Sequence, residues 1–284
     1  MNLEKLLNLA NDLPDAVKEN AVNLVTRMGE VIEGIGDEPV VWRPSYLRIV
    51  QGTTDRTKLP KGTGIGDLII GENKMESPLK VIPLRMHDAR QFWSPDPNEN
   101  KMLCSSPDSK FGYIGNECRS CPHSQFNEET KKSECAKMKT VMVVLADLSD
   151  VIVVNFSKTN YSVGREWETT MKKAAVLPYR RTYGLSAKTN TAYKNIENYD
   201  VQILDAKERN TPSELIPFLT ELFTQVGEDR KETLVKFYEF IKNRKESGAP
   251  ALANSADSEM TLITSDEVAV EAPQGAEMAT KYEV

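Results

Sequence analysis

The chain has 284 residues, of which 39% are hydrophobic and 27% are charged, a composition typical of a folded soluble protein. It contains no run of about 18 apolar residues, which argues against a membrane span. The N-terminus is amphipathic and carries acids early, without the basic start and small-residue cleavage site of a signal peptide. These features predict a cytoplasmic protein.

The net charge of -6 is concentrated at one end of the chain. Residues 251–284 contain seven acids and one base, and removing these from the totals of 42 acids and 36 bases leaves 35 of each. This C-terminal stretch is also rich in Ala, Ser, Glu and Pro, so it is predicted to be a disordered acidic tail.

The first elements predicted along the chain are two short helices within residues 3–34, interrupted at Pro14. Between about 40 and 205 the pattern changes to short β-like runs with one internal helix at 164–176. This pattern predicts an α+β fold with a small antiparallel barrel or sandwich. The predicted strands are residues 46–52, 67–71, 79–86, 181–188 and 198–204, together with a strand pair within 140–157.

Two more helices are predicted at 211–226 and 228–247, and Pro217 indicates that the first of them is kinked or starts late. The chain is thus divided into four parts. They are an N-terminal helical segment (1–38), a β core (39–210) with an insertion at about 100–140, C-terminal helices (211–247) and the acidic tail (248–284).

All four cysteines lie in one window, with the spacing Cys104-x13-Cys118-x2-Cys121-x13-Cys135. A C-x2-C turn supplies two ligands of a tetrahedral metal site, and the outer two cysteines would complete it. Because this polar window cannot build a large core, a bound metal would order it. The spacing predicts a structural zinc, Zn(II), held by the four thiolates.

Other uses of the cysteines fit less well. A thioredoxin-like redox pair needs a βαβ context that is absent here, and disulfides do not suit a reducing compartment. His123 could replace one cysteine, but a surface position is favoured, and His87 is predicted to be structural. A closed four-thiolate site has no open position for water, which argues against metal catalysis.

Residues 171–194 carry six cations and no acid, with tyrosines interleaved. Cations that follow phosphates and aromatic faces that stack on bases are what single-stranded nucleic acid needs, although a solvated edge strand would show a similar pattern. The candidate binding residues are Lys172, Lys173, Tyr179, Arg180, Arg181, Tyr183, Lys188, Tyr193 and Lys194.

A second basic stretch, residues 42–62, has Asp55 as its one acid. Tyr46 lies nearby, and Trp42 is predicted to be a core residue. The stretch adds further candidate nucleic-acid contacts, which are Arg43, Arg48, Arg56 and Lys58.

A zinc-bearing β core with an N-terminal element and an acidic C-terminus resembles phage-encoded single-stranded-DNA-binding (helix-destabilising) proteins. The cysteine pattern "MLCSSPD…ECRSCP…SECAKMKTVMVVL", with Pro122 after the C-x2-C pair, is also similar to a loosely defined group of phage proteins in which such a window precedes a hydrophobic strand pair. The resemblance covers roughly residues 40–205 in layout. It implies an oligonucleotide-binding (OB)-like β core with inserted zinc, an acidic C-terminus and a role in phage replication or recombination.

The sequence therefore predicts a non-enzymatic, sequence-tolerant single-stranded-DNA-binding protein with structural zinc, whose tail contacts other replication or transcription proteins. The main alternative is a zinc-ribbon adaptor that binds RNA polymerase or another phage protein. A metal-dependent nuclease is a third class, for which no cluster of acids stands out in the core.

Overall fold

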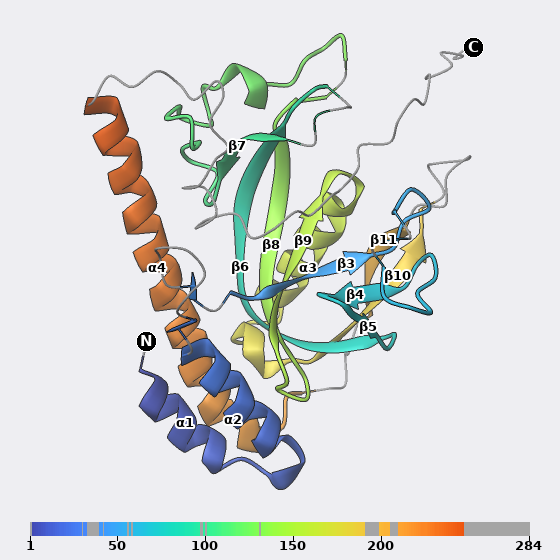
Figure 1. The fold of residues 1–284 in the computed structure, drawn as a ribbon, viewed down its shortest axis with the longest axis vertical. Coiled ribbons are helices and arrows are strands. Elements are labelled where there is room, and N and C mark those ends of the chain that lie inside the picture. Colours follow the sequence, from blue (N-terminus) through green and yellow to red (C-terminus); the bar gives the residue numbers. More distant parts are fainter. Residues whose placement is uncertain are drawn as a thin grey trace.

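The computed structural model describes residues 2–29, 31–32, 40–41, 43–55, 57, 59–96, 99, 101–130, 132–190, 199–204 and 210–246. These residues form a mixed α+β fold, as predicted (Figure 1). The α-helices are α1 (Leu3–Asn11), α2 (Asp15–Gly29), α3 (Tyr161–Lys173) and α4 (Ile216–Glu246).

The strands belong to two sheets. A small one pairs β1 (Val31–Ile32) with β2 (Val40–Val41). The large one contains β3 (Ser45–Ile49), β4 (Leu68–Ile70), β5 (Asn73–Met75), β6 (Leu79–Trp93), β7 (Met102–Ser106), β8 (Ala136–Leu145), β9 (Val151–Ser157), β10 (Tyr183–Thr189) and β11 (Tyr199–Leu204).

The large sheet has the order β11-β10-β6-β8-β9-β3-β4-β5, with β7 paired to the far end of β6. Every pair is antiparallel except β3 with β9. Among the described strands β5 does not pair with β11, so the sheet is open and a closed barrel is not shown. The side chain of Gln51 nevertheless bridges two distant parts of the sheet, accepting from the backbone N–H of Tyr199 (2.7 Å) and donating to its carbonyl (2.9 Å).

Side chains alternate between two faces along each central strand, and different helices cover the two faces. We call the first the α3 face, because Val141, Val154 and Phe156 share a buried cluster there with Trp167 of α3. The Trp167 ring meets Phe156 edge-on at 5.8 Å. Gly164 allows this close approach, since an added Cβ would lie 2.8 Å from the Phe156 Cβ.

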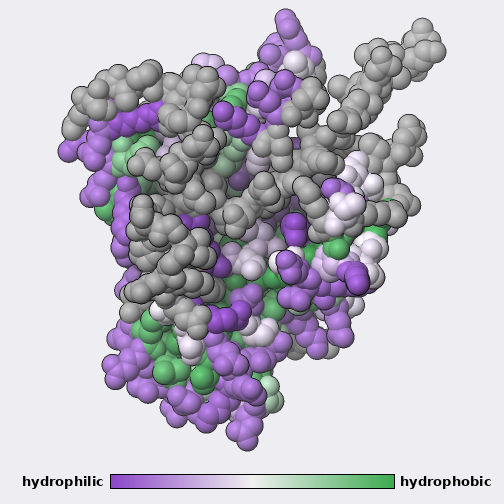
Figure 2. All heavy atoms as spheres, viewed as in Figure 1, coloured by the Kyte–Doolittle hydropathy of each residue, from purple (hydrophilic) through white to green (hydrophobic). Residues whose placement is uncertain are grey.

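The opposite face, which we call the α4 face, packs against α1, α2 and the first half of α4. Ile82 and Val144 point to this side and share a cluster with Leu24 and Phe218. Figure 2 shows hydrophobic side chains between hydrophilic ones over these helices, in the lower part of the view. The two faces together bury most of the apolar side chains of β6, β8 and β9, which explains why the sequences of these strands are strongly hydrophobic.

The prediction of two C-terminal helices is wrong, because α4 is one helix of 31 residues. Pro217 is its second residue, where the missing N–H costs no hydrogen bond. Gly227 lies inside the helix where Arg85 crosses it, and an added Cβ there would be 2.1 Å from the Arg85 Nη2. Arg85 donates to the Phe223 carbonyl (3.0 Å from Nη2), so the glycine marks a helix–sheet contact rather than a break.

The other predicted elements are confirmed in type, with shifted bounds. The strand predicted at 79–86 continues to Trp93, and the internal helix begins at Tyr161. The strands β1, β2, β5 and β7 were not predicted, and Val31 and Ile32 of β1 lie in the stretch that was predicted to be helical. The extension of β6 matters most, because it carries β7 and the cysteine window away from the helical end of the molecule (Figure 1).

Candidate metal centre and candidate nucleic-acid interface

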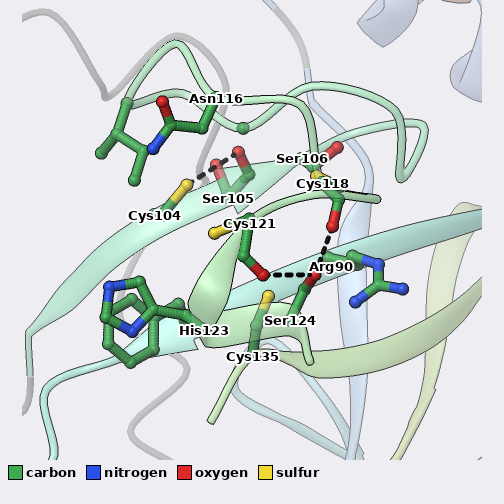
Figure 3. A pocket seen from close by; sticks show the side chains of 13 residues that line it. Arg90, Cys104, Ser105, Ser106, Asn116, Cys118, Cys121, His123, Ser124 and Cys135 are labelled. Atoms are coloured by element: carbon green, nitrogen blue, oxygen red, sulfur yellow. Dashed lines mark hydrogen bonds between the residues drawn. The ribbon is translucent and has the colours of Figure 1, made fainter. Parts of the chain in front are cut away.

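The four cysteines come from separate turns and strand ends and line one cavity (Figure 3). Cys104 lies in β7, and Cys135 directly precedes β8. Cys118 and Cys121 come from the loop between these strands, just before the short 3-10 helix η2 (Pro122–Ser124). The long excursion between β7 and β8 thus returns all four thiols to the end of the sheet.

Ser124 holds the C-x2-C turn in shape. Its hydroxyl donates to the carbonyls of Cys118 and Cys121, the latter at 3.0 Å, as the dashed lines of Figure 3 show. The backbone N–H of Cys135 donates to the His123 carbonyl at 2.8 Å. These contacts connect the turn to the start of β8 through the backbone.

Three of the thiols are buried, and burial decides their protonation. Desolvation raises the pKa of Cys104 and of Cys118, and raises the pKa of Cys135 to about 11. The thiols are therefore protonated at neutral pH in the absence of a cation, and a metal would have to displace their protons. Gly112 leaves room for the Cys104 thiol, since an added Cβ would lie 2.7 Å from its Sγ.

The donor set fits zinc in kind and number, because four thiolates suffice for a tetrahedral structural site. Among the residues that the structure describes, however, no group of three or more His, Cys, Asp or Glu side chains is arranged to hold one metal ion. The zinc site thus stays a prediction. His123 stacks on Phe92 at 4.3 Å and contacts Glu134 at 2.5 Å, and its side chain is 42% exposed, in line with the surface position expected for it.

The second half of α4 packs directly on the cysteine segment, by which we mean residues 104–135. Phe237 and Ile241 share a buried cluster with Cys104 and Cys135. The Tyr113 ring stacks on Phe240 at 4.8 Å. Polar contacts flank this cluster: Arg230 donates to the Pro107 carbonyl (3.0 Å), Arg244 donates to the Tyr113 carbonyl (3.1 Å), and the Tyr238 hydroxyl donates to Asp108.

The stacking role predicted for two tyrosines is wrong. Tyr179 and Tyr183 are each only 2% exposed. Tyr179 packs against Phe223 and accepts a hydrogen bond from Thr220, while Tyr183 meets Trp167 edge-on at 5.3 Å. Both rings belong to hydrophobic clusters, so neither offers a face to a base.

The described cations of the same stretch do reach the surface. Lys173, Arg180 and Lys188 are exposed, and Arg181 is half-buried beside its backbone bridge to Asn210. Lys172 is exposed and pairs with Glu168 at 2.7 Å. The structure therefore supports an electrostatic role for this stretch but not a stacking one. Tyr193 and Lys194 lie outside the described residues.

In the second stretch Arg43 is exposed and Arg48 is half-buried, donating to the Gly71 carbonyl at 2.9 Å. Arg56, Lys58 and Trp42 lie outside the described residues. The sequence interpretation gave no role to Tyr46, which is half-buried two residues from Arg48 on the same strand. The alternation in "YLRI" was the available signal, since Leu47 and Ile49 face the core and their neighbours must face away.

His87 gives a pH-dependent stability that can be tested. Burial is the main reason that its pKa falls from 6.5 to about 3, with Arg230 and Lys139 adding to the effect against Asp108. Below about pH 6.5 the unfolded chain binds a proton at His87 that the folded chain does not, so the free energy of unfolding decreases as the pH is lowered. By pH 5 the loss is about 2 kcal/mol relative to pH 7. Urea denaturation at both pH values should show this difference, and it should shrink in His87→Gln; an unchanged difference in the variant would contradict the assignment.

Comparisons with protein-family models, with curated proteins and with solved structures found no match. The resemblance to phage single-stranded-DNA-binding proteins accordingly stays a prediction. No helix within the described parts of the chain has the length and apolar character needed to cross a membrane.

Proposed function

We propose that the chain is a non-enzymatic, sequence-tolerant single-stranded-DNA-binding protein of phage replication or recombination, stabilised by zinc in the cysteine segment. The observation that carries the proposal is a pair of acid-free surface runs. In residues 43–51 and 171–190, every charged side chain is a cation. Residues 1–250 as a whole carry equal numbers of acids and bases, so these two runs are local concentrations of positive charge that would attract phosphate.

The OB-like core and the zinc insertion belong to the same proposal. The link from Gln51 to Tyr199 brings the β3 end of the sheet to β11, which supports a partly closed, barrel-like sheet. Zinc would be held by Cys104, Cys118, Cys121 and Cys135, and it would supply local order rather than a catalytic position. The acidic tail would compete with DNA for the cations and could contact basic partner proteins.

A second candidate is a zinc-ribbon adaptor for RNA polymerase or another phage protein. The observation that favours it is the exposure of Phe126, 63% exposed on the surface of the cysteine segment. An exposed ring on a small rigid module suits a protein contact. This candidate requires the cysteine segment for function but not the two acid-free runs.

Fluorescence anisotropy with a labelled dT oligonucleotide separates the two candidates. The intact chain and a chain ending at Gly248 are titrated at 50 and 200 mM salt. About four phosphate contacts would weaken binding roughly 50-fold between these concentrations. Salt-sensitive binding that tightens without the tail supports the proposal, whereas no binding by either chain at low salt overturns it and favours the adaptor.

A further inference from the structure

A row of polar side chains crosses the α4 face of four adjacent strands. In the antiparallel pairs, Asn155 of β9 lies opposite Thr140 of β8, and Thr140 lies opposite His87 of β6. In the parallel pair Tyr46 lies opposite Val153, which faces the same side of β9 as Asn155 two residues further along, and Arg48 faces this side two residues after Tyr46 on β3. Strands far apart in the sequence thus place His87, Thr140 and Asn155 side by side, with Tyr46 and Arg48 on the same face of the next strand.

The row is partly exposed, and the strands that form it bring no acidic side chain to this face. Tyr46, Arg48, Asn155 and Thr140 are all partly exposed. No Asp or Glu occupies an α4-face position on β3, β6, β8 or β9, all of which the structure describes. At about 4.8 Å between strands the row spans about 14 Å, a width that crosses only a few nucleotides. A polyanion therefore meets no carboxylate from these four strands along the row.

The side chains of the row offer a polyanionic ligand three kinds of contact: a hydrogen-bond donor, a cation and an aromatic ring. The Thr140 hydroxyl donates to Asn155 Oδ1 at 3.0 Å, which orients the amide with its NH2 group on the other side as a donor. Arg48 is held at this face by its hydrogen bond to the Gly71 carbonyl. Tyr46, one row further along, adds a ring that is not enclosed in either hydrophobic cluster.

We propose that this row is the surface on which single-stranded nucleic acid binds, an inference that rests on the proposed function. A base stacks on Tyr46, a phosphate contacts Arg48, and the Asn155 amide donates to a base edge or phosphate oxygen. The exposed cations Lys172 and Lys173 at the end of α3, and Arg180 in the 3-10 helix η4 (Pro178–Arg180), attract the strand at longer range. Because Tyr179 and Tyr183 of the same stretch are buried, no base stacks on a ring there.

Matched variants test the row in the anisotropy assay with the intact chain. Tyr46→Ala should weaken binding about tenfold through the loss of one stacked base, while Tyr46→Phe, which keeps the ring, should bind within about twofold of the original chain. Asn155→Asp keeps the acceptor for Thr140 but puts a carboxylate on the face, and should weaken binding about tenfold. Arg48→Gln should lower the salt slope by about 0.7, the amount for one phosphate contact.

Asn73→Asp is the matched charge control. Asn73 is exposed at a position opposite Ile70, on the α3 side of the sheet, so the same charge change there should leave binding within about twofold. If the original chain binds but Tyr46→Ala and Asn155→Asp bind equally well, the row is overturned while the proposed function stands. If the original chain does not bind, the proposed function itself fails. Thermal unfolding of each variant checks that it is folded. If Tyr46→Ala is unfolded, the binding of Asn155→Asp alone tests whether nucleic acid binds at the row.

Discussion

Removing zinc from the cysteine segment is expected to unfold that segment and to loosen the second half of α4. The segment has few buried apolar side chains of its own, and two of its buried thiols, Cys104 and Cys135, share a cluster with Phe237 and Ile241. Structural zinc contributes on the order of 10 kcal/mol of binding free energy, part of which is local folding free energy. Hydrogen exchange should therefore rise in residues 104–135 and in residues 230–246 after chelation, and remain slow in β6, β8 and β9.

The matched variants are Cys118→Ser and Ser120→Ala, two residues apart in the same turn. Cys118→Ser should lose the zinc that elemental analysis is expected to find at one ion per chain, whereas Ser120→Ala should retain it. Ser120 is exposed and its hydroxyl donates one long hydrogen bond to the Glu117 carbonyl (3.3 Å), so its loss costs little. A purified chain that contains no zinc and shows the same exchange before and after chelation would contradict the prediction.

Phe237→Ala is expected to lower the free energy of unfolding by about 3–5 kcal/mol, the cost of removing a fully buried phenyl ring. Phe237 is 1% exposed and lies between α4 and the cysteine segment. Urea denaturation followed by circular dichroism measures the change. Val235→Ala, two residues earlier at a site that is 54% exposed, should change stability by less than about 0.5 kcal/mol. Equal effects of the two substitutions would show that the segment does not pack on α4.

Sequence patterns predicted the α+β class and the central strands because local hydrophobic patterning determines both. In α2 the apolar residues recur at helical spacing, whereas the strand pair within 140–157 consists of two short runs rich in β-branched residues around a turn. The same reasoning failed at Gly227, where a glycine that suggests a helix end instead accommodates Arg85. Only the contact with Arg85 shows that Gly227 marks a helix–sheet crossing and not the end of a helix.

For the candidate sites too, local sequence patterns predicted some features, while others depend on tertiary contacts. The four cysteines could be grouped from their spacing alone, and the structure places them around one cavity. Tyr179 and Tyr183 were misassigned because a tyrosine in a basic run can face either the core or solvent, and burial depends on Phe223 and Trp167 elsewhere in the chain. The row through Arg48, Asn155 and Thr140 could not be predicted, because it exists only once three separate strands are in register.

The packing of α1 and α2 against the first half of α4 has a consequence for how the protein is made. The backbone N–H of Asn2 donates to Gln225 at 2.8 Å, and Lys5 pairs with Glu221 at 2.5 Å, so the first helix meets its partner more than 200 residues later. During synthesis the apolar faces of α1 and α2 stay without that cover until α4 has left the ribosome. A nascent chain stalled before residue 216 should therefore bind chaperones through these two helices, and completion of α4 should release it.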